Sequence, residues 1–329
     1  MEQYIGVDLH KAFFQVAAVD VAGIRVWEER FPFTPLGIAG FVNRCAVGDR
    51  IAVEASGPTW PFADAVGANG QSLVIVDPRK TRLKAGYAAK TDRLDARRLA
   101  DALRRESVVS VYYPSLAVRQ LRELCRYRAT VVRLRVGIKQ RIHALLLRHA
   151  VIPPRCSDLF GVRGQRWLAT VTLPDFAGQS LTAQRALLLW VSDQLTQLTT
   201  QVRACALGDP VAQALDQIVG IGAILGLFVR AEVGDITRFP DAPHLASYAG
   251  LVPSVEQSGG RCYYGRITRE GSPWLRWALV EAAIHRMRPR DPLGRWATQL
   301  AIRKGALKAR VAVARRLCEE IFDAWPRTV

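Results

Sequence analysis

The sequence predicts an α/β domain followed by two mainly helical domains, and three observations lead to this fold class. Residues 3–110 alternate short strand-like runs with helix-like runs, an order that favours a mixed sheet covered by helices. The middle of the chain repeats apolar residues at the spacing of a coiled coil. The last third joins short helical runs by glycine-rich segments. The predicted domains are residues 1–112, 113–207 and 208–329.

The first domain is expected to follow the order strand, strand, strand, helix, strand, helix, strand, helix. Its first three strand-like runs lie close together, which favours a meander with turn residues at 20–23. Helices are expected near 36–46 and 59–69, with the strands RIAVEAS and SLVIVDP before and after the second of them. After Pro78 the sequence turns helical and polar, and residues 92–105 form the clearest helix.

The middle domain is expected to pair two long helices in a coiled coil. Apolar residues recur every seven positions, with two more at the intermediate heptad position. They are Leu124, Val131, Ile138 and Leu145, with Tyr127 and Leu134 between them. A second stretch, 181–205, is expected to return antiparallel to the first. The first helix also carries many arginines against the lone Glu123, so Arg128 and Arg135 are candidate nucleic-acid contacts.

The composition indicates a polyanionic partner. Lys and Arg number 46 against 29 Asp and Glu, which gives a formal charge of +17. Because arginine binds phosphate in bidentate fashion, we expect a nucleic acid. The six cysteines form no C-x-x-C pair, which argues against a zinc knuckle or a disulfide framework. With no signal-peptide pattern and no uncharged apolar run of about 18 residues, a cytoplasmic protein without membrane contact is expected.

Four acidic residues occupy positions that require explanation. Asp8 lies inside an apolar strand-like run and Glu54 ends another, where a buried charge is costly unless it is paired or binds a metal. Asp92 and Asp95 lie at the start of a helix, which places their side chains about 5–6 Å apart on one face. Taken singly, each acid is better explained as a cap or as the ion-pair partner of a nearby arginine.

Taken together, the four acids match a ribonuclease-H-like nuclease, in which carboxylates from distant segments converge at one edge of a mixed sheet. Mg²⁺ prefers hard oxygen ligands, and two such ions about 3.5–4 Å apart stabilise the attacking and leaving oxygens in phosphodiester chemistry. The sequence therefore predicts that Asp8, Glu54, Asp92 and Asp95 bind Mg²⁺.

A short glycine motif in the last third is a candidate DNA contact. The residues Val-Gly-Ile-Gly at 219–222 match the hairpin of a helix-hairpin-helix element. In such a hairpin, Gly220 and Gly222 let backbone N–H groups approach a phosphate. A tight turn between two core helices explains the same residues.

A second glycine-rich segment carries a candidate nucleophile. Ser258 precedes two glycines and is flanked by Arg261 and Arg266, which can stabilise a phosphorane-like transition state. Serine before two glycines is also a common turn residue. With no histidine close by and no G-x-S-x-G elbow, a serine hydrolase is a poor interpretation.

These motifs resemble those of the DEDD transposases of the IS110 family, relatives of the Piv-type invertases. YIGVDLHK, VEASG, VIVDP and KTDRLDAR match its first-domain motifs in order and spacing, with VDP standing where relatives often have Asn before the proline. The C-terminal pattern of the family fits residues 248–253, 258–259, 265–271 and 275–276.

The resemblance implies a RuvC-like first domain and a C-terminal domain in which Ser258 is the nucleophile that joins covalently to DNA. Ser254 and Ser272 match that position less well. The implied partners are DNA and a structured bridge RNA. The implied assembly is a homo-oligomer, a dimer or tetramer, with active sites composed between protomers. The expected protein is thus a bacterial, nucleoid-associated recombinase that cuts and rejoins DNA.

Two other functions fit the same residues. One is a metal-dependent nuclease or junction resolvase, in which water attacks the phosphodiester and Ser258 is a turn residue. The other is a nucleic-acid-binding protein without enzymatic activity, in which the acids form salt bridges.

Overall fold

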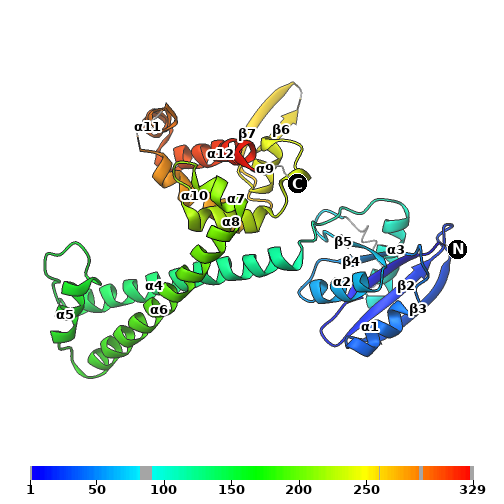
Figure 1. The fold of residues 1–329 in the computed structure, drawn as a ribbon, viewed down its shortest axis with the longest axis horizontal. Coiled ribbons are helices and arrows are strands. Elements are labelled where there is room, and N and C mark those ends of the chain that lie inside the picture. The colour runs from blue at the N-terminus through cyan, green and yellow to red at the C-terminus, as the bar shows by residue number, and fades with distance from the viewer. Residues whose placement is uncertain (1, 82–90, 259, 289–291, 327–329) are drawn as a thin grey trace. The chain divides into compact units, whose positions relative to one another are not determined.

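The computed structural model describes residues 2–81, 91–258, 260–288 and 292–326. Contacts divide the chain into two compact units, Met1–Tyr113 and Pro114–Val329 (Figure 1). The division into the three domains named above remains a prediction.

The first unit is built on a five-stranded mixed sheet, as predicted. Its strands are β1 (Tyr4–Leu9), β2 (Phe13–Val19), β3 (Arg25–Pro32), β4 (Arg50–Glu54) and β5 (Ser72–Val76). They lie in the order β3-β2-β1-β4-β5, with β2 antiparallel to β1 and β3, and with β4 parallel to β1 and β5. This arrangement is consistent with a ribonuclease-H-like fold.

Helices cover both faces of the sheet in the first unit (Figure 1). They are α1 (Pro35–Val42), α2 (Thr59–Ala68) and α3 (Asp92–Arg104). On one face, alternate residues such as Ile5 and Val7 pack with phenylalanines of α1 and α2. On the other face, Ala52 and Val76 pack with Leu99 and Leu103 of α3. The alternation of the strands therefore fixes which side chains point toward α3.

Helix α3 begins where its sequence provides a cap. Thr91 has extended backbone angles, and its hydroxyl accepts a hydrogen bond from the backbone N–H of Leu94. This satisfies one of the free N–H groups of the first turn, and the two aspartates in that turn favour the positive end of the helix dipole. The cap thus places Asp92 at the first position of the helix.

The second unit begins with two long helices that pack against each other in antiparallel directions (Figure 1). These are α4 (Leu116–Arg148) and α6 (Asp175–Gly208), with α5 (Val162–Thr170) between them. Along α4 the buried residues Val131, Ile138, Ile142 and Leu145 recur at intervals of seven, four and three. Helix α6 therefore packs along the seven-residue repeat of α4 and along the positions four residues after each repeat residue, such as Ile142 after Ile138.

This row corrects the predicted seam. Tyr127 and Leu134, expected inside it, are 54% and 43% exposed. The intermediate seam positions belong instead to Arg128 and Arg135, both half-buried, and the Arg128 Nε donates to the Thr199 hydroxyl of α6 at 3.0 Å. Long arginine stems cover apolar surface while their charged heads reach polar groups, so arginine is tolerated at such positions.

The rest of the second unit consists of short helices around one core that also contains Cys125 and Ala129 of α4 and Val202 of α6. The helices are α7 (Pro210–Asp216), α8 (Ala223–Val233), the 3₁₀ turn η1 (Ile236–Arg238), α9 (Ala242–Tyr248), α10 (Pro273–Arg286), α11 (Pro292–Lys304) and α12 (Ala306–Ala324). A two-stranded antiparallel hairpin, β6 (Pro253–Ser258) and β7 (Arg261–Ile267), projects from them (Figure 1). Within the described residues, no helix is both long and apolar enough for a membrane span.

Candidate functional site

The carboxyl ends of two neighbouring strands bring the first pair of acids together. Val7 of β1 lies beside Val53 of the parallel strand β4, so Asp8 and Glu54 are the next residues in register. Adjacent strands are about 4.8 Å apart. Because Ile5, Val7 and Val53 face the core under α1 and α2, alternation turns Asp8 and Glu54 toward the face that carries α3.

Gly6 allows α3 to approach this face closely. A Cβ atom at Gly6 would lie 2.1 Å from the backbone oxygen of Ala96 and 2.5 Å from the nitrogen of Ala100. Only glycine therefore permits the observed contact between β1 and α3. Asp92 lies one helical turn before Ala96, and Asp8 lies two residues after Gly6, on the same side of the strand. The close packing at Gly6 thus carries Asp92 to Asp8.

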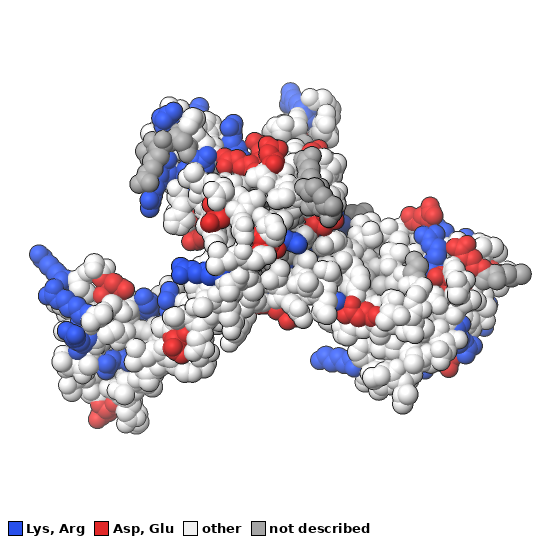
Figure 2. Space-filling view, viewed as in Figure 1, with Lys and Arg blue, Asp and Glu red and all other residues white. Residues whose placement is uncertain are grey.

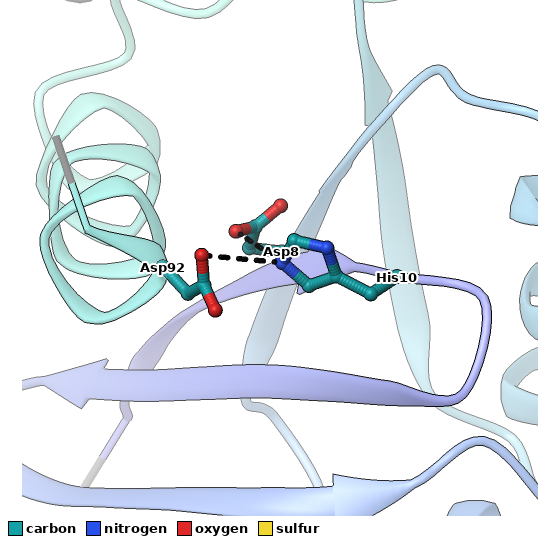
Figure 3. A group of neighbouring side chains, drawn as sticks. All are labelled: Asp8, His10 and Asp92. Carbon is teal, nitrogen blue, oxygen red and sulfur yellow. Dashed lines mark hydrogen bonds and ion pairs between the residues drawn. The ribbon is translucent and has the colours of Figure 1, made fainter.

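Asp8, Asp92 and the neighbouring His10 form a compact group (Figure 3). Their ligand atoms, one from each residue, all lie within 4.8 Å of one another. The His10 Nε2 is 3.2 Å from the Asp8 Oδ2 and 3.4 Å from the Asp92 Oδ1. The fold therefore brings Asp8 and Asp92 together, while the predicted metal site of four acids remains a prediction.

Asp95 and Glu54 lie outside that three-residue group within the described part of the chain. Asp95 is close enough for its charge to act on Asp8, and it accepts a hydrogen bond from Arg98 Nη1 at 3.3 Å. Glu54 is half-buried at the end of β4. The four predicted acids thus lie on the α3 side of the sheet, near the carboxyl ends of β1 and β4. Of these acids, Asp8 and Asp92 are in direct proximity.

His10 is the residue that sequence reasoning did not include among the metal ligands. The signal was the alternation Asp8-x-His10, because residues two apart on an extended chain lie on the same side. Leu9, between them, packs into the core under α1 and α2.

The electrostatics of the group favour a cation. Burial is the main cause that raises the pKa of Asp8, the negative charges of Asp92 and Asp95 raise it further, and His10 opposes the shift. Arg30 Nη2 lies 3.5 Å from the Asp92 Oδ2 and supplies part of the compensating charge. Carboxylates held this close repel one another, and a bound divalent cation removes that repulsion.

The donor set fits a divalent metal. Carboxylate oxygens are the ligands that Mg²⁺ and Mn²⁺ prefer, and one imidazole nitrogen is available beside them. Because the donors come from a strand end, a turn and a capped helix start, their backbones are held by packing rather than by a flexible loop. Such a site can activate and orient a phosphodiester.

The predicted Ser258 loop is a β-hairpin. Ser258 is the last residue of β6 and pairs with Arg261, the first residue of β7, while Gly259 lies outside the described residues. Ser258 and Arg261 are both exposed, as is Arg266 farther along β7. Pairing and alternation put the Ser258 hydroxyl, Arg261 and Tyr263 on one face of the hairpin.

The rival serine Ser272 has a structural role. Its hydroxyl accepts from the backbone N–H of Leu275 as the cap of α10 and donates to Glu232 Oε2 at 2.8 Å. Glu232 is 1% exposed and also accepts two hydrogen bonds from Arg126, at 2.7 and 2.9 Å. Ser272 is therefore occupied by this buried network.

The Gly220 and Gly222 motif joins α7 to α8 and lines a cavity of about 640 Å³, together with Arg203 and His285. Gly220 has φ +95°, and a Cβ there would lie 2.8 Å from the backbone oxygen of Ala282 in α10. Packing thus requires this glycine. Gly222 is exposed, begins α8, and has open space around it. Of the two, Gly222 is the one available to a ligand.

Arg128 and Arg135 do not form the free basic surface that the sequence indicated. Both occupy the α4–α6 seam, and burial lowers the pKa of Arg128, with Arg135 and Arg203 nearby as like charges. Exposed arginines gather instead over the end of the helical pair around α5 (Figure 2). This basic tip consists of Arg141, Arg148, Arg155, Arg163 and Arg166.

The chain matches two family models. The DEDD transposase model of the IS110 type matches residues 5–150, which include the four acids and His10. A model described as the transposase IS116/IS110/IS902 family matches residues 212–297, which include Ser258.

Two curated relatives match nearly the whole chain, and a third matches about half of it. A probable family 20 transposase of Pseudomonas aeruginosa is 26% identical over 95% of this chain and 93% of its own length. The transposase for insertion sequence element IS1111A of Coxiella burnetii is 25% identical over 95% of this chain and 86% of its own. An insertion element IS110 protein of Streptomyces coelicolor is 32% identical over 46% of this chain and 36% of its own.

Proposed function

Because the chain belongs to the IS110/IS116/IS902 family of transposases, we propose that it cuts and rejoins DNA with a divalent-metal centre at the edge of its sheet. The observation that carries this proposal is the convergence of Asp8 and Asp92 with His10, on the face that Glu54 and Asp95 share. In this proposal Mg²⁺ is the ion, and the four acids hold it or its bound water.

The residues of the first unit have distinct tasks in this proposal. Asp8 and Asp92 supply the oxygen atoms closest to the ion, and Gly6 keeps them together by letting α3 rest on β1. Arg30 shields Asp92 until the site is loaded. When bound, the ion supplies the positive charge that stabilises oxygens at the scissile phosphate.

The nucleophile is the finer part of the proposal. Ser258 Oγ attacks phosphorus, loses its proton and forms a phosphoserine bond, while the bond to the departing DNA oxygen breaks and that oxygen takes up a proton. Attack by a DNA hydroxyl on the phosphoserine then reverses these changes and rejoins the strand. The exposed hydroxyl beside Arg261 supports this role, because the guanidinium can bind the non-bridging oxygens.

A water nucleophile is the second candidate, and the DEDD domain favours it. RuvC-like carboxylate sites act as nucleases, and no contact among the described residues links Ser258 to a base. In that case the products are hydrolysed ends, and Ser258 serves only the turn of the hairpin.

A trapped DNA substrate separates these two chemistries. A suicide DNA with a nick near the cleavage site should yield a covalent adduct on the peptide that contains Ser258, detectable by mass spectrometry. Ser258→Ala should abolish the adduct, whereas the matched control Ser254→Ala, four residues earlier on the same strand, should retain it. Full cleavage by Ser258→Ala without an adduct would establish water as the nucleophile.

DNA and a structured bridge RNA are the proposed partners. The net charge of +17 and the basic tip support a nucleic-acid surface, because exposed arginines contribute to binding by releasing counterions from phosphates. Gly222 and Arg266 are further proposed contacts. A dimer or tetramer is the proposed assembly, in which acids and Ser258 come from different protomers. Sequencing of RNA that co-purifies with the protein tests the RNA partner directly.

A further inference from the structure

We propose that His10 is a direct ligand of the divalent cation and that its imidazole raises the affinity of this centre for Mn²⁺ relative to Mg²⁺. The inference rests on the proposed metal function of Asp8 and Asp92, and adds a nitrogen ligand to an otherwise all-oxygen set.

The distances agree with shared coordination. Metal–ligand bonds in such sites are about 2.1 Å long, so neighbouring ligand atoms around one ion lie about 3.0–3.4 Å apart. The His10 Nε2 is 3.2 Å from the Asp8 oxygen and 3.4 Å from the Asp92 oxygen. All three ligand atoms fall within 4.8 Å of one another, a span that one ion can bridge.

Hydrogen bonding explains this arrangement less well. A single N–H at Nε2 points in one direction, so it cannot donate in line to carboxylates on two different elements. The 3.2 Å separation from the Asp8 Oδ2 allows one hydrogen bond, whereas the 3.4 Å separation from the Asp92 Oδ1 lies beyond normal N–H···O distances, which run to about 3.2 Å. An ion among the three side chains satisfies both carboxylates and the nitrogen lone pair at once.

The ring is held in place by its own strand turn. The backbone N–H of His10 donates to the Phe13 carbonyl at 2.9 Å, which closes the turn between β1 and β2. The imidazole stacks on the Phe13 ring with 4.6 Å between centroids, and the Arg30 guanidinium lies over the same ring at 4.0 Å. Turn and stacking thus orient Nε2 toward the acids without any help from a ligand.

A nitrogen ligand shifts the relative affinities of the site for different divalent ions. Mg²⁺ takes oxygen ligands almost exclusively, whereas imidazole suits transition metals, and affinity at mixed sites rises from Mn²⁺ toward Cu²⁺. With His10 coordinated, the ratio of Mn²⁺ to Mg²⁺ affinity should exceed that of the all-oxygen variant His10→Asp by about tenfold.

The test uses Mn²⁺ bound to the full-length protein. Pulsed electron paramagnetic resonance detects the nuclear spin of a nitrogen bonded directly to Mn²⁺. Wild-type protein should show this coupling, His10→Gln should lose it, and His244→Gln should keep it, since His244 lies in the second unit and is 62% exposed at its side chain. Calorimetric titration with MnCl₂ and MgCl₂ measures the affinity ratio of wild type and His10→Asp.

The outcomes separate this inference from the proposed function. Binding of Mn²⁺ that Asp8→Asn abolishes, without nitrogen coupling in wild type, overturns the role of His10 and leaves the metal centre intact. Coupling that persists in His10→Gln also overturns it, because another histidine is then the ligand. Mn²⁺ binding that Asp8→Asn leaves unchanged overturns the metal centre and this inference together. Absence of nitrogen coupling in the wild-type spectrum overturns the inference without any variant, and circular dichroism of His10→Gln shows whether a lost coupling comes from a folded protein.

Discussion

The acidic group at the carboxyl ends of β1 and β4 and the Ser258 hairpin are organised in opposite ways. This edge of the sheet joins acids from three distant segments through close packing, with α3 resting on Gly6 and His10 stacked on Phe13. The hairpin exposes each described residue from Ser254 to Arg266, and its two strands are joined by backbone pairing. The acidic group is therefore held together by packing within the first unit, whereas the hairpin presents its side chains to solvent.

Asp92→Asn should have the largest effect, because it removes an inner carboxylate while the helix start remains. Strand cleavage should fall by at least about a hundredfold. Cleavage of a labelled DNA duplex measures it. The matched control is Asp101→Asn, which lies on the same helix but pairs only with Arg104 and Arg105 among the described residues. Equal losses in both variants would indicate a folding defect and contradict the assignment.

Gly6→Ala should push α3 away from β1 and so separate Asp92 from Asp8. The added Cβ meets the Ala96 oxygen, so α3 must shift away from β1, at a cost of about 1–3 kcal/mol in unfolding free energy. Mn²⁺ affinity should fall as well, because Asp92 moves with the helix. Gly57→Ala, where the added Cβ meets nothing within 4 Å, is the control. Urea unfolding and metal titration report the two effects, and normal metal binding by Gly6→Ala would refute the positioning role.

Ser272→Ala tests whether Ser272 stabilises the second unit, from which the hairpin projects. Loss of the α10 cap and of the bond to Glu232 should lower the unfolding free energy by about 1–2 kcal/mol. The DNA adduct proposed at Ser258 should persist at reduced temperature. An adduct lost from Ser272→Ala while circular dichroism shows a folded protein would transfer the nucleophilic role to Ser272.

Asp8→Asn should have the smallest effect on stability, and its sign depends on pH. The pKa of Asp8 is raised in the folded state, so folding favours its protonated form. The metal-free protein therefore loses stability as pH rises from the unfolded pKa, near 3.8, through the folded pKa. Above that window the neutral asparagine should be the more stable. Thermal unfolding with EDTA at pH 4 and pH 7 checks this, and a variant less stable at pH 7 would contradict it.

The sequence was sufficient to predict the mixed sheet and to single out four acids. Asp8 and Glu54 stood out as charges in apolar strand-like runs, and Asp92 and Asp95 by their three-residue spacing at a helix start. Of these four, the structure brings Asp8 and Asp92 into one group, and the metal-binding role of the acids remains a prediction. His10 was missed, since one histidine after a strand carries no signal until the helix that faces it is known.

Longer-range packing limited the remaining predictions. Tyr127 and Leu134 had the right spacing for a seam, but α6 packs along the neighbouring row, where arginine stems replace apolar residues. The strands β6 and β7 were not predicted because a polar, glycine-containing segment lacks the apolar alternation of a buried strand. Their exposure explains that composition.

The most direct test of the central claim is a crystal structure of the full-length protein soaked with Mn²⁺, with the ion located by its anomalous scattering. We expect an anomalous peak at the carboxyl ends of β1 and β4, within about 2.5 Å of carboxylate oxygens of Asp8 and Asp92. A bound ion elsewhere, or an edge that stays free of Mn²⁺ at saturating concentration, would contradict it.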